Sequence, residues 1–202
     1  ALRETAYADD TIIVLWSDHG WHLGEKNHWH KSTLWEEATR IPFMVSVPGL
    51  TKGGTRCERP VDLLCVYPTL IELCGLEPRK ELDGVSIVPL LKNPEIEWNF
   101  PAVTEFKRGQ CAVRSERFRY IRYSDGTEEL YDHFKDPNEW TNLASKESCR
   151  KIMDALGLWI PRKFAPSAPS KSAYLFDPQT YSWIHKKTGK VTHGSSVSRF
   201  ER

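Results

Sequence analysis

Three side chains capable of chemistry lie close together near the start of the chain. Asp18 and His19 belong to the tetrapeptide Ser17-Asp18-His19-Gly20, and Lys31 follows a short loop. A carboxylate offers a hard oxygen ligand to a cation, an imidazole binds a cation or donates to an anion, and an ammonium is a compact positive charge. These residue types make the segment a candidate binding site for a cation or an anion. The competing interpretation is purely local, with Asp18 as a turn cap, His19 as a hydrogen-bonded rim residue and Lys31 on a solvated surface.

The residues around the tetrapeptide predict the elements that position it. Thr11–Trp16 is apolar or β-branched almost without interruption, which is typical of a strand buried on both faces of a parallel sheet. Open α/β sheets place their ligands at the carboxyl ends of such strands. Ile41–Val47 predicts a second strand, and Pro42 favours a position at or near a sheet edge. The first part of the chain is therefore expected to be α/β.

The segment SDHGWHLGEKNHWHKSTLWEEATRIPF resembles the corresponding segment of the type I sulfatases of the alkaline-phosphatase superfamily, most closely the iduronate-2-sulfatase branch. The resemblance implies that Asp18 and His19 lie beside a Ca²⁺ ion and that Lys31 binds the sulfate ester, with His19 and Lys31 as the catalytic residues. It also suggests that Trp21, His28 and Trp29 line the mouth of the site and contact a sugar ring. For each tryptophan, simple packing is the alternative.

The resemblance continues along the chain to about Pro161. VDLLCVYPTLIELCGLEP and LDGVSIVPLL are similar to a helix of the family and the segment after it, and AVRSERFRYIRYSDGTEELYDHFKDPNEWTNLA is similar to its small carboxyl-terminal domain. Where Cys65 stands, the family often has aspartate. Asp132, His133 and Asp136 are expected to be architectural and not metal ligands.

The nucleophile that the resemblance implies has no counterpart in the sequence. In the family it is a formylglycine hydrate, made from the first residue of a C/S-x-P-S-R motif, and no such motif occurs here. We therefore expect the carboxyl-terminal part of a sulfatase, inactive alone, whose partner is the amino-terminal portion carrying the nucleophile. The expected substrate is a sulfated small molecule or glycan, and the family suggests an extracytoplasmic location.

Three alternatives stay open. A phosphodiesterase or phosphonate monoester hydrolase of the same superfamily would use Zn²⁺ or Mn²⁺ at the same Asp-His-Gly. A non-catalytic binding module would need no nucleophile. A zinc site unrelated to sulfatases could be formed by the pairs His19-x-x-His22 and His28-x-His30.

Composition excludes some classes of protein. The hydrophobic fraction of 40% is enough for a core, and the formal net charge of +1 gives no reason to expect a nucleic acid partner. No apolar run is long enough for a membrane span. The five cysteines are odd in number and lack a C-x-x-C pair, which argues against a disulfide framework. Cys65 and Cys74 are expected to be small core residues.

The remaining elements follow from periodicity. Val61–Gly75 has helical spacing with Gly75 as its carboxyl cap, and Ser148–Trp159 predicts a last helix with Ile152, Met153, Leu156 and Trp159 on one stripe. Between them, short runs predict an antiparallel meander over 102–106, 111–114, 118–123 and 129–132, with a turn at Asp125-Gly126. The meander carries several arginines, which are expected on a solvated sheet face: Arg108, Arg114, Arg117, Arg119 and Arg122.

The sequence thus predicts an α/β protein with an α+β later part, and three regions. Residues 1–100 form the end of an alkaline-phosphatase-like mixed sheet with the metal and sulfate loop, and residues 101–160 form a small antiparallel-sheet-plus-helix subdomain. Residues 161–202 are a basic, Pro/Ser-rich extension. Within it, Tyr174–Ile184 is expected to pack as an extended arm and Thr192–Arg202 to be poorly ordered.

Overall fold

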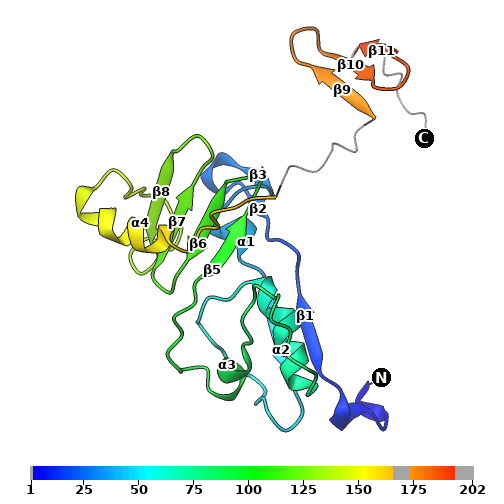
Figure 1. Ribbon diagram of the computed structural model, residues 1–202, viewed down its shortest axis with the longest axis vertical. Coiled ribbons are helices and arrows are strands. Elements are labelled where there is room, and N and C mark those ends of the chain that lie inside the picture. The colour runs from blue at the N-terminus through cyan, green and yellow to red at the C-terminus, as the bar shows by residue number, and fades with distance from the viewer. Residues whose placement is uncertain (1, 166–172, 194–202) are drawn as a thin grey trace. The chain divides into compact units, whose positions relative to one another are not determined.

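The structure is a computed structural model, which describes residues 2–165 and 173–193 (Figure 1). It divides into two compact units, residues 1–165 and 166–202. Its described part combines small antiparallel sheets with short helices, so the expected α/β class, α+β in its later part, is confirmed. Most of the segment expected to be poorly ordered, residues 194–202, lies outside the described residues. Two 3₁₀ turns, Leu2–Glu4 and Ala8–Asp10, precede the first strand.

The first strand was predicted correctly as a strand but wrongly as a buried, parallel one. β1 (Ile13–Trp16) pairs antiparallel with β4 (Phe43–Ser46), and Ile13, Leu15 and Trp16 are each 48% exposed. The other face of β1 carries Val14, which faces α2 (Val66–Leu73). An apolar run of residues predicts a strand that could be buried, but it does not predict the direction of that strand or which of its faces is covered. Neighbouring elements determine its direction and which faces are covered, and here α2 lies beside β1 (Figure 1).

The predicted helix over 61–75 is confirmed. It begins with a 3₁₀ turn, Leu63–Cys65, whose amino end is capped by the Asp62 carboxylate, which accepts from the Leu64 amide at 3.1 Å. α2 continues to Leu73, and Gly75 adopts a left-handed φ of +62° just beyond it. Cys65 is buried as expected, but Cys74 is exposed because it follows the last helical turn. α3 (Val88–Lys92) packs beside Cys65 through Leu90.

The segment between β1 and β4 forms a small hairpin. β2 (His22–Leu23) pairs antiparallel with β3 (Trp29–His30), with a 3₁₀ turn, Glu25–Asn27, between them. α1 (Glu36–Thr39) follows. Gly20 donates its amide to the Ala38 carbonyl at 2.8 Å, and a Cβ added at Gly20 would lie 1.9 Å from the Glu37 carbonyl oxygen. Glycine is therefore required where the Asp-His-Gly segment passes α1.

The predicted meander is a four-stranded antiparallel sheet in sequential order. Its strands are β5 (Ala102–Glu105), β6 (Cys111–Arg114), β7 (Phe118–Arg122) and β8 (Glu128–Asp132). One face packs on α4 (Arg150–Gly157), which follows a 3₁₀ turn at Glu147–Cys149 and buries Met153 completely. Trp159, predicted for the same stripe, is 44% exposed because the helix has ended before it.

The other face of this sheet is covered, contrary to the prediction for Arg114 and Arg119, whereas Arg108 and Arg117 are exposed as expected. Ile121 and Tyr131 pack there against Leu34, which is 1% exposed, so the chain just after Lys31 covers the sheet. Arg119 lies on this covered face and is 2% exposed, and Arg114 is half-buried. The alternation of Arg119 with Tyr120 predicted the face correctly, but what covers it comes from a distant part of the chain.

The second unit contains a three-stranded antiparallel sheet in the order β11-β10-β9. β9 (Tyr174–Asp177), β10 (Ser182–His185) and β11 (Val191–His193) make up this meander, where the sequence predicted only an extended arm. All five cysteines of the chain are free, as the absence of a disulfide framework predicted. Among the described residues no helix has the length and apolarity to cross a bilayer.

Candidate functional site

The structure brings Asp18, His19 and Lys31 together at the carboxyl end of β1. The Lys31 ammonium nitrogen lies 2.7 Å from His19 Nε2, and the Asp18 Oδ2 atom lies 3.4 Å from the same nitrogen. The Asp18 side chain is 81% exposed and the His19 side chain 29% exposed. A half-buried cation, an imidazole and an open carboxylate thus share one small area of surface, which is the juxtaposition that the sequence predicted.

The hydrogen bonds of His19 define which ring nitrogen carries its proton. Nδ1 lies 2.8 Å from the carbonyl oxygen of Gly20, and because a carbonyl only accepts, Nδ1 must donate. In the neutral ring Nε2 then carries the lone pair and accepts from the Lys31 ammonium. His19 therefore orients Lys31 here. A metal ion on the same nitrogen would have to displace the lysine, whereas Asp18 remains open to a cation.

The backbone on both sides of Lys31 is strained. His30 and Ser32 have φ angles of +94° and +78°, in the left-handed region that non-glycine residues rarely adopt. The Lys31 carbonyl oxygen lies 3.2 Å from His28 Nε2 and 3.2 Å from His30 Nδ1. Such a conformation persists only where its surroundings hold it. The loop therefore presents Lys31 in one enforced orientation.

The aromatic residues predicted for the mouth of the site are dispersed. Trp21 is 49% exposed, and its ring centroid lies 6.0 Å from that of His19, so it borders the site. His28 lies behind Lys31, edge-on to the buried His22 ring at 4.9 Å, and its Nε2 faces the Lys31 carbonyl. Trp29 is 67% exposed and packs over Gly24. Of this group, Trp21 lies beside the His19 ring and His28 contacts the Lys31 backbone, whereas Trp29 packs away from both predicted catalytic residues.

The loop histidines do not assemble a zinc site. Among the described residues, the cluster with three potential ligand atoms within 4.8 Å of one another contains Glu36, His133 and Glu139, and none of the loop histidines. His22 is fully buried, with Nε2 2.7 Å from Thr33 Oγ1, and burial lowers its pKa. The structure thus uses His22 for packing and a hydrogen bond.

A buried ionic cluster lies directly behind the segment of residues 26–36 that carries Lys31, which we call the Lys31 loop. Arg119, on β7, pairs with the carboxylates of Glu36 and Glu139, and its Nε lies 2.6 Å from Glu139 Oε1. The Nε–H is not aligned for a hydrogen bond, so this contact is an ion pair. His133 Nε2 lies 2.8 Å from the same Glu139 oxygen. Glu139 is completely buried, and Arg114 adds a second guanidinium 3.4 Å from Glu36.

This cluster holds both stems of the Lys31 loop against the four-stranded sheet. On the first stem, Lys26 donates to the Glu139 carbonyl and lies over the rings of Trp35 and Tyr131. On the second stem, the Glu36 amide donates to Glu139 Oε2 at 3.0 Å, and Arg119 donates to the Leu34 carbonyl. Trp35 also donates its Nε1–H to Glu129 at 2.7 Å. We call Glu36, Arg114, Arg119, His133 and Glu139 the loop clamp.

The electrostatics of the loop clamp keep its carboxylates ionised. Burial alone would raise the pKa of Glu139, but the His133 hydrogen bond and the Arg119 charge outweigh it, so that pKa lies below its usual value. The same holds for Glu36, where the charges of Arg119 and Arg114 outweigh burial. The Arg119 guanidinium already provides the positive charge that a metal ion would otherwise bring to these carboxylates. The loop clamp is accordingly an ionic network and not a metal centre.

Sequence reasoning did not find the loop clamp. His133 was expected to be architectural, which its contact with Glu139 supports, and Asp132 likewise binds Arg117 at 2.9 and 2.7 Å. Asp136 caps the amides of Trp140 and Thr141. The available signal was the apolar character of Ile121 and Tyr123 on the face of Arg119, because such a face is seldom left in water.

A family model matches most of the chain. Residues 24–162 match the family described as N-sulphoglucosamine sulphohydrolase, C-terminal. The match covers the Lys31 loop, the loop clamp and α4. It begins after Asp18 and His19 and ends before the three-stranded sheet of the second unit.

Curated relatives are named sulfatases. A sulfatase of Formosa agariphila is 40% identical over 197 residues, 98% of this chain and 38% of its own length. The dog arylsulfatase K is 32% identical over 164 residues, and the choline-sulfatase of Rhizobium meliloti is 36% identical over 151 residues. This chain spans 30% and 29% of their lengths, so it corresponds to about a third of each. With the Formosa protein the similarity extends well beyond Pro161, where the sequence analysis ended it.

Solved structures agree with these relatives. A structure in complex with its substrate D-glucosamine-2-N,6-O-disulfate is 28% identical, with a TM-score of 0.69 over 78% of this chain and 34% of that one. The phosphonate monoester hydrolase of Agrobacterium radiobacter is also 28% identical, with a TM-score of 0.64 over 78% of this chain and 35% of that one. The fold of the chain is therefore that of sulfatase structures, which are alkaline-phosphatase-like. By its sequence and its fold, this chain belongs to the sulfatases, in the family described as N-sulphoglucosamine sulphohydrolase, C-terminal.

Proposed function

We propose that this chain forms one side of the active site of a sulfatase that hydrolyses sulfate monoesters, with a sulfated carbohydrate as the substrate. The observation that supports this most is the convergence of Lys31 and Asp18 on His19 Nε2, at 2.7 and 3.4 Å, at the end of β1. A family member bound to a disulfated glucosamine supports the substrate class. The finer placement in the iduronate-2-sulfatase branch is part of the proposal.

Each residue of the site has a role that its geometry allows. The Lys31 ammonium binds a sulfate oxygen and stabilises the negative charge that grows as the ester bond breaks. His19 accepts from Lys31 through Nε2, which keeps the ammonium aimed at the site. Trp21, beside His19, offers a ring to the sugar, whereas His28 positions the Lys31 backbone. Trp29 is retained as a peripheral contact.

Sulfatase membership implies a divalent cation, and the donor set fits one in part. Asp18 is open to solvent and offers hard carboxylate oxygens, which suit Ca²⁺. A bound cation would polarise the sulfate oxygens. Ca²⁺ takes about six to eight oxygen ligands, so Asp18 supplies only a share of them. His19 joins the metal ligands only if Lys31 releases Nε2, which would favour Zn²⁺ or Mn²⁺ over Ca²⁺.

The proposal includes parts of the protein beyond these residues. A formylglycine nucleophile, as the family uses, would come from an amino-terminal sulfatase portion that acts as the partner of this chain. Residues 1–100 would belong to the catalytic core, 101–160 to the small subdomain and 161–202 to an extension. An extracytoplasmic location follows from the family.

The competing function is phosphonate monoester or phosphodiester hydrolysis, because a phosphonate monoester hydrolase shares the fold. Paired assays of the full-length protein on an aryl sulfate and an aryl phosphate, with metal analysis, distinguish the two. Faster sulfate turnover with bound Ca²⁺ supports the sulfatase. Faster phosphate turnover with Zn²⁺ or Mn²⁺ supports the alternative. A full-length protein that binds a sulfated sugar but turns over neither ester would be a binding module.

The Lys31→Ala substitution tests the site itself. Loss of one preorganised charge at the reacting ester is expected to reduce kcat on aryl sulfate by about 10²- to 10³-fold. The matched control is Lys80→Ala, which removes an exposed lysine of the same unit. Equal activity of the two variants would contradict the assignment of Lys31.

A further inference from the structure

We infer that the three-stranded sheet of the second unit is a second binding surface, which takes sulfated glycan through an aromatic face and three lysines. The choice of ligand rests on the proposed function. The surface itself rests on the register, ring contacts, exposure and charges of residues 173–193. The site around Lys31 is not part of it.

The two faces of this sheet differ in chemistry. Residues that pair directly across antiparallel strands project to the same side. Trp183 pairs with Phe176, and His185 pairs with Tyr174, so these four rings share one face. The Phe176 and Trp183 ring centroids lie 4.7 Å apart, and those of Tyr174 and His185 lie 5.0 Å apart. Tyr181 extends the row, with its ring 6.2 Å from that of Phe176.

The opposite face is aliphatic. Ile184 pairs with Leu175 on one side and with Val191 on the other. Branched aliphatic side chains are suited to packing against protein, whereas flat rings also suit the apolar face of a sugar. The aromatic row is accessible: Phe176 and Trp183 are 46% and 45% exposed, and Tyr181 is 72% exposed. We therefore assign the aromatic face to the ligand.

Positive charge lies at one end of the aromatic row. Lys186, Lys187 and Lys190 are exposed in the turn between β10 and β11, directly after His185. The Lys186 amide donates to the Ala173 carbonyl at 2.8 Å, so the turn lies beside the start of β9. Each ammonium can bind a sulfate ester as a point charge.

The acidic residue of this sheet does not neutralise the lysines. Within residues 173–193 it is Asp177, at the far end of β9. Its carboxylate accepts from the Gln179 amide at 2.9 Å and from Thr180 Oγ1 at 2.7 Å. A row of rings with cationic side chains at one end complements a chain of sugar rings that carry sulfate groups. In a sulfatase, such a surface would keep a polymeric substrate bound to the enzyme.

The test is calorimetric binding of the full chain to a heparin oligosaccharide, with unsulfated heparosan of the same length as the comparison. We expect binding to heparin that weakens with added salt, and little binding to heparosan. Tyr181→Ala, at the exposed end of the row, and the triple variant Lys186→Gln/Lys187→Gln/Lys190→Gln should each weaken binding by about tenfold. Neither set of side chains is buried, so the sheet should keep its fold.

The matched controls remove the same kinds of side chain, lysines and an aromatic ring, from the first unit. Lys52→Gln/Lys80→Gln/Lys92→Gln removes three exposed lysines from the first unit, and Trp140→Ala removes a ring that is 64% exposed there. Both should bind heparin as the unaltered chain does. Equal losses in the control and test variants would overturn the inference. So would binding to single-stranded DNA as tight as to heparin, because a basic and aromatic surface of that kind would be a nucleic-acid site.

Turnover of a small aryl sulfate by the full-length protein separates this inference from the proposed function. If heparin binding depends on Tyr181 and the lysines but the protein turns over no sulfate ester, the second binding surface is supported and the sulfatase assignment is refuted. If the protein turns over the aryl sulfate fully but its heparin binding is insensitive to these residues, the sulfatase assignment is supported and the second binding surface is refuted.

Discussion

The most informative perturbation of this molecule is Glu139→Gln, in the loop clamp. The substitution keeps the shape of the side chain and removes its charge. Arg119, 2% exposed, is then left with the partly buried Glu36 as its remaining carboxylate partner. Breaking a buried ion pair by removal of one member costs about 3–5 kcal/mol, and because Glu36 remains we expect the lower end, about 3 kcal/mol.

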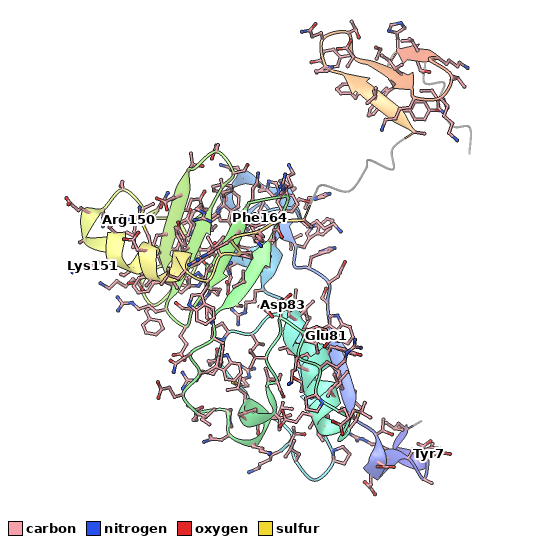
Figure 2. All side chains as sticks on the ribbon, in the orientation of Figure 1. Tyr7, Glu81, Asp83, Arg150, Lys151 and Phe164 are labelled. Carbon is pink, nitrogen blue, oxygen red and sulfur yellow. The ribbon has the colours of Figure 1, made fainter. Side chains whose placement is uncertain are left out.

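Urea unfolding of the full chain, followed by circular dichroism, measures this cost. Arg119→Met should cost at least as much, because it leaves the buried Glu139 carboxylate without a guanidinium and leaves Glu36 with Arg114 alone. The double variant should recover part of the loss, with a coupling free energy of about 2 kcal/mol. The matched control is Asp154→Asn, which breaks the exposed ion pair of Asp154 with Arg150 and should change stability little. Arg150 is labelled on α4 in Figure 2.

The loop clamp should also affect the Lys31 loop beyond its effect on stability. Glu139 binds both stems, through its backbone carbonyl on Lys26 and its carboxylate on the Glu36 amide. Amide hydrogen exchange of residues 28–33 should therefore be faster in Glu139→Gln than in Asp154→Asn at equal distance from the unfolding midpoint. Equal exchange in the two variants, or a coupling free energy near zero, would refute this reasoning.

Three further outcomes follow from the same structure. Glu36 and Glu139 of the loop clamp have lowered pKa values, so their contribution to stability is present at neutral pH and should be lost as the pH falls through those folded pKa values. Unfolding at stepped acidic pH measures this loss, and a stability that is flat below pH 5 would contradict it. Gly20→Ala should destabilise by about 1–3 kcal/mol, because its Cβ would meet the Glu37 carbonyl, whereas Gly53→Ala, with open space around it, should not. Burial raises the pKa of Cys65 to about 12 and of Cys111 to about 11, so a thiol reagent at pH 8 should modify both only after unfolding, and rapid labelling of either in the native chain would show that the fold is wrong there.

The amino-acid sequence by itself determined the local elements and the site segment. The helical spacing of Val61–Gly75 and the alternation in the meander each depend on neighbours a few residues away, which is the range over which periodicity is informative. Asp18 and His19 were found from their place at the end of an apolar strand, whereas Lys31 was singled out by the resemblance to the type I sulfatases. Their metal-binding and catalytic roles remain predictions.

Only the tertiary structure decided what covers these elements. The direction of β1 depends on β4. The burial of Arg119 depends on Glu36, which lies 83 residues before it, and on Glu139, which lies 103 residues from Glu36. No local pattern reports such partners, because burial is a property of both surfaces in contact. The clamp on the Lys31 loop therefore became visible only when the loop and the sheet were seen packed together.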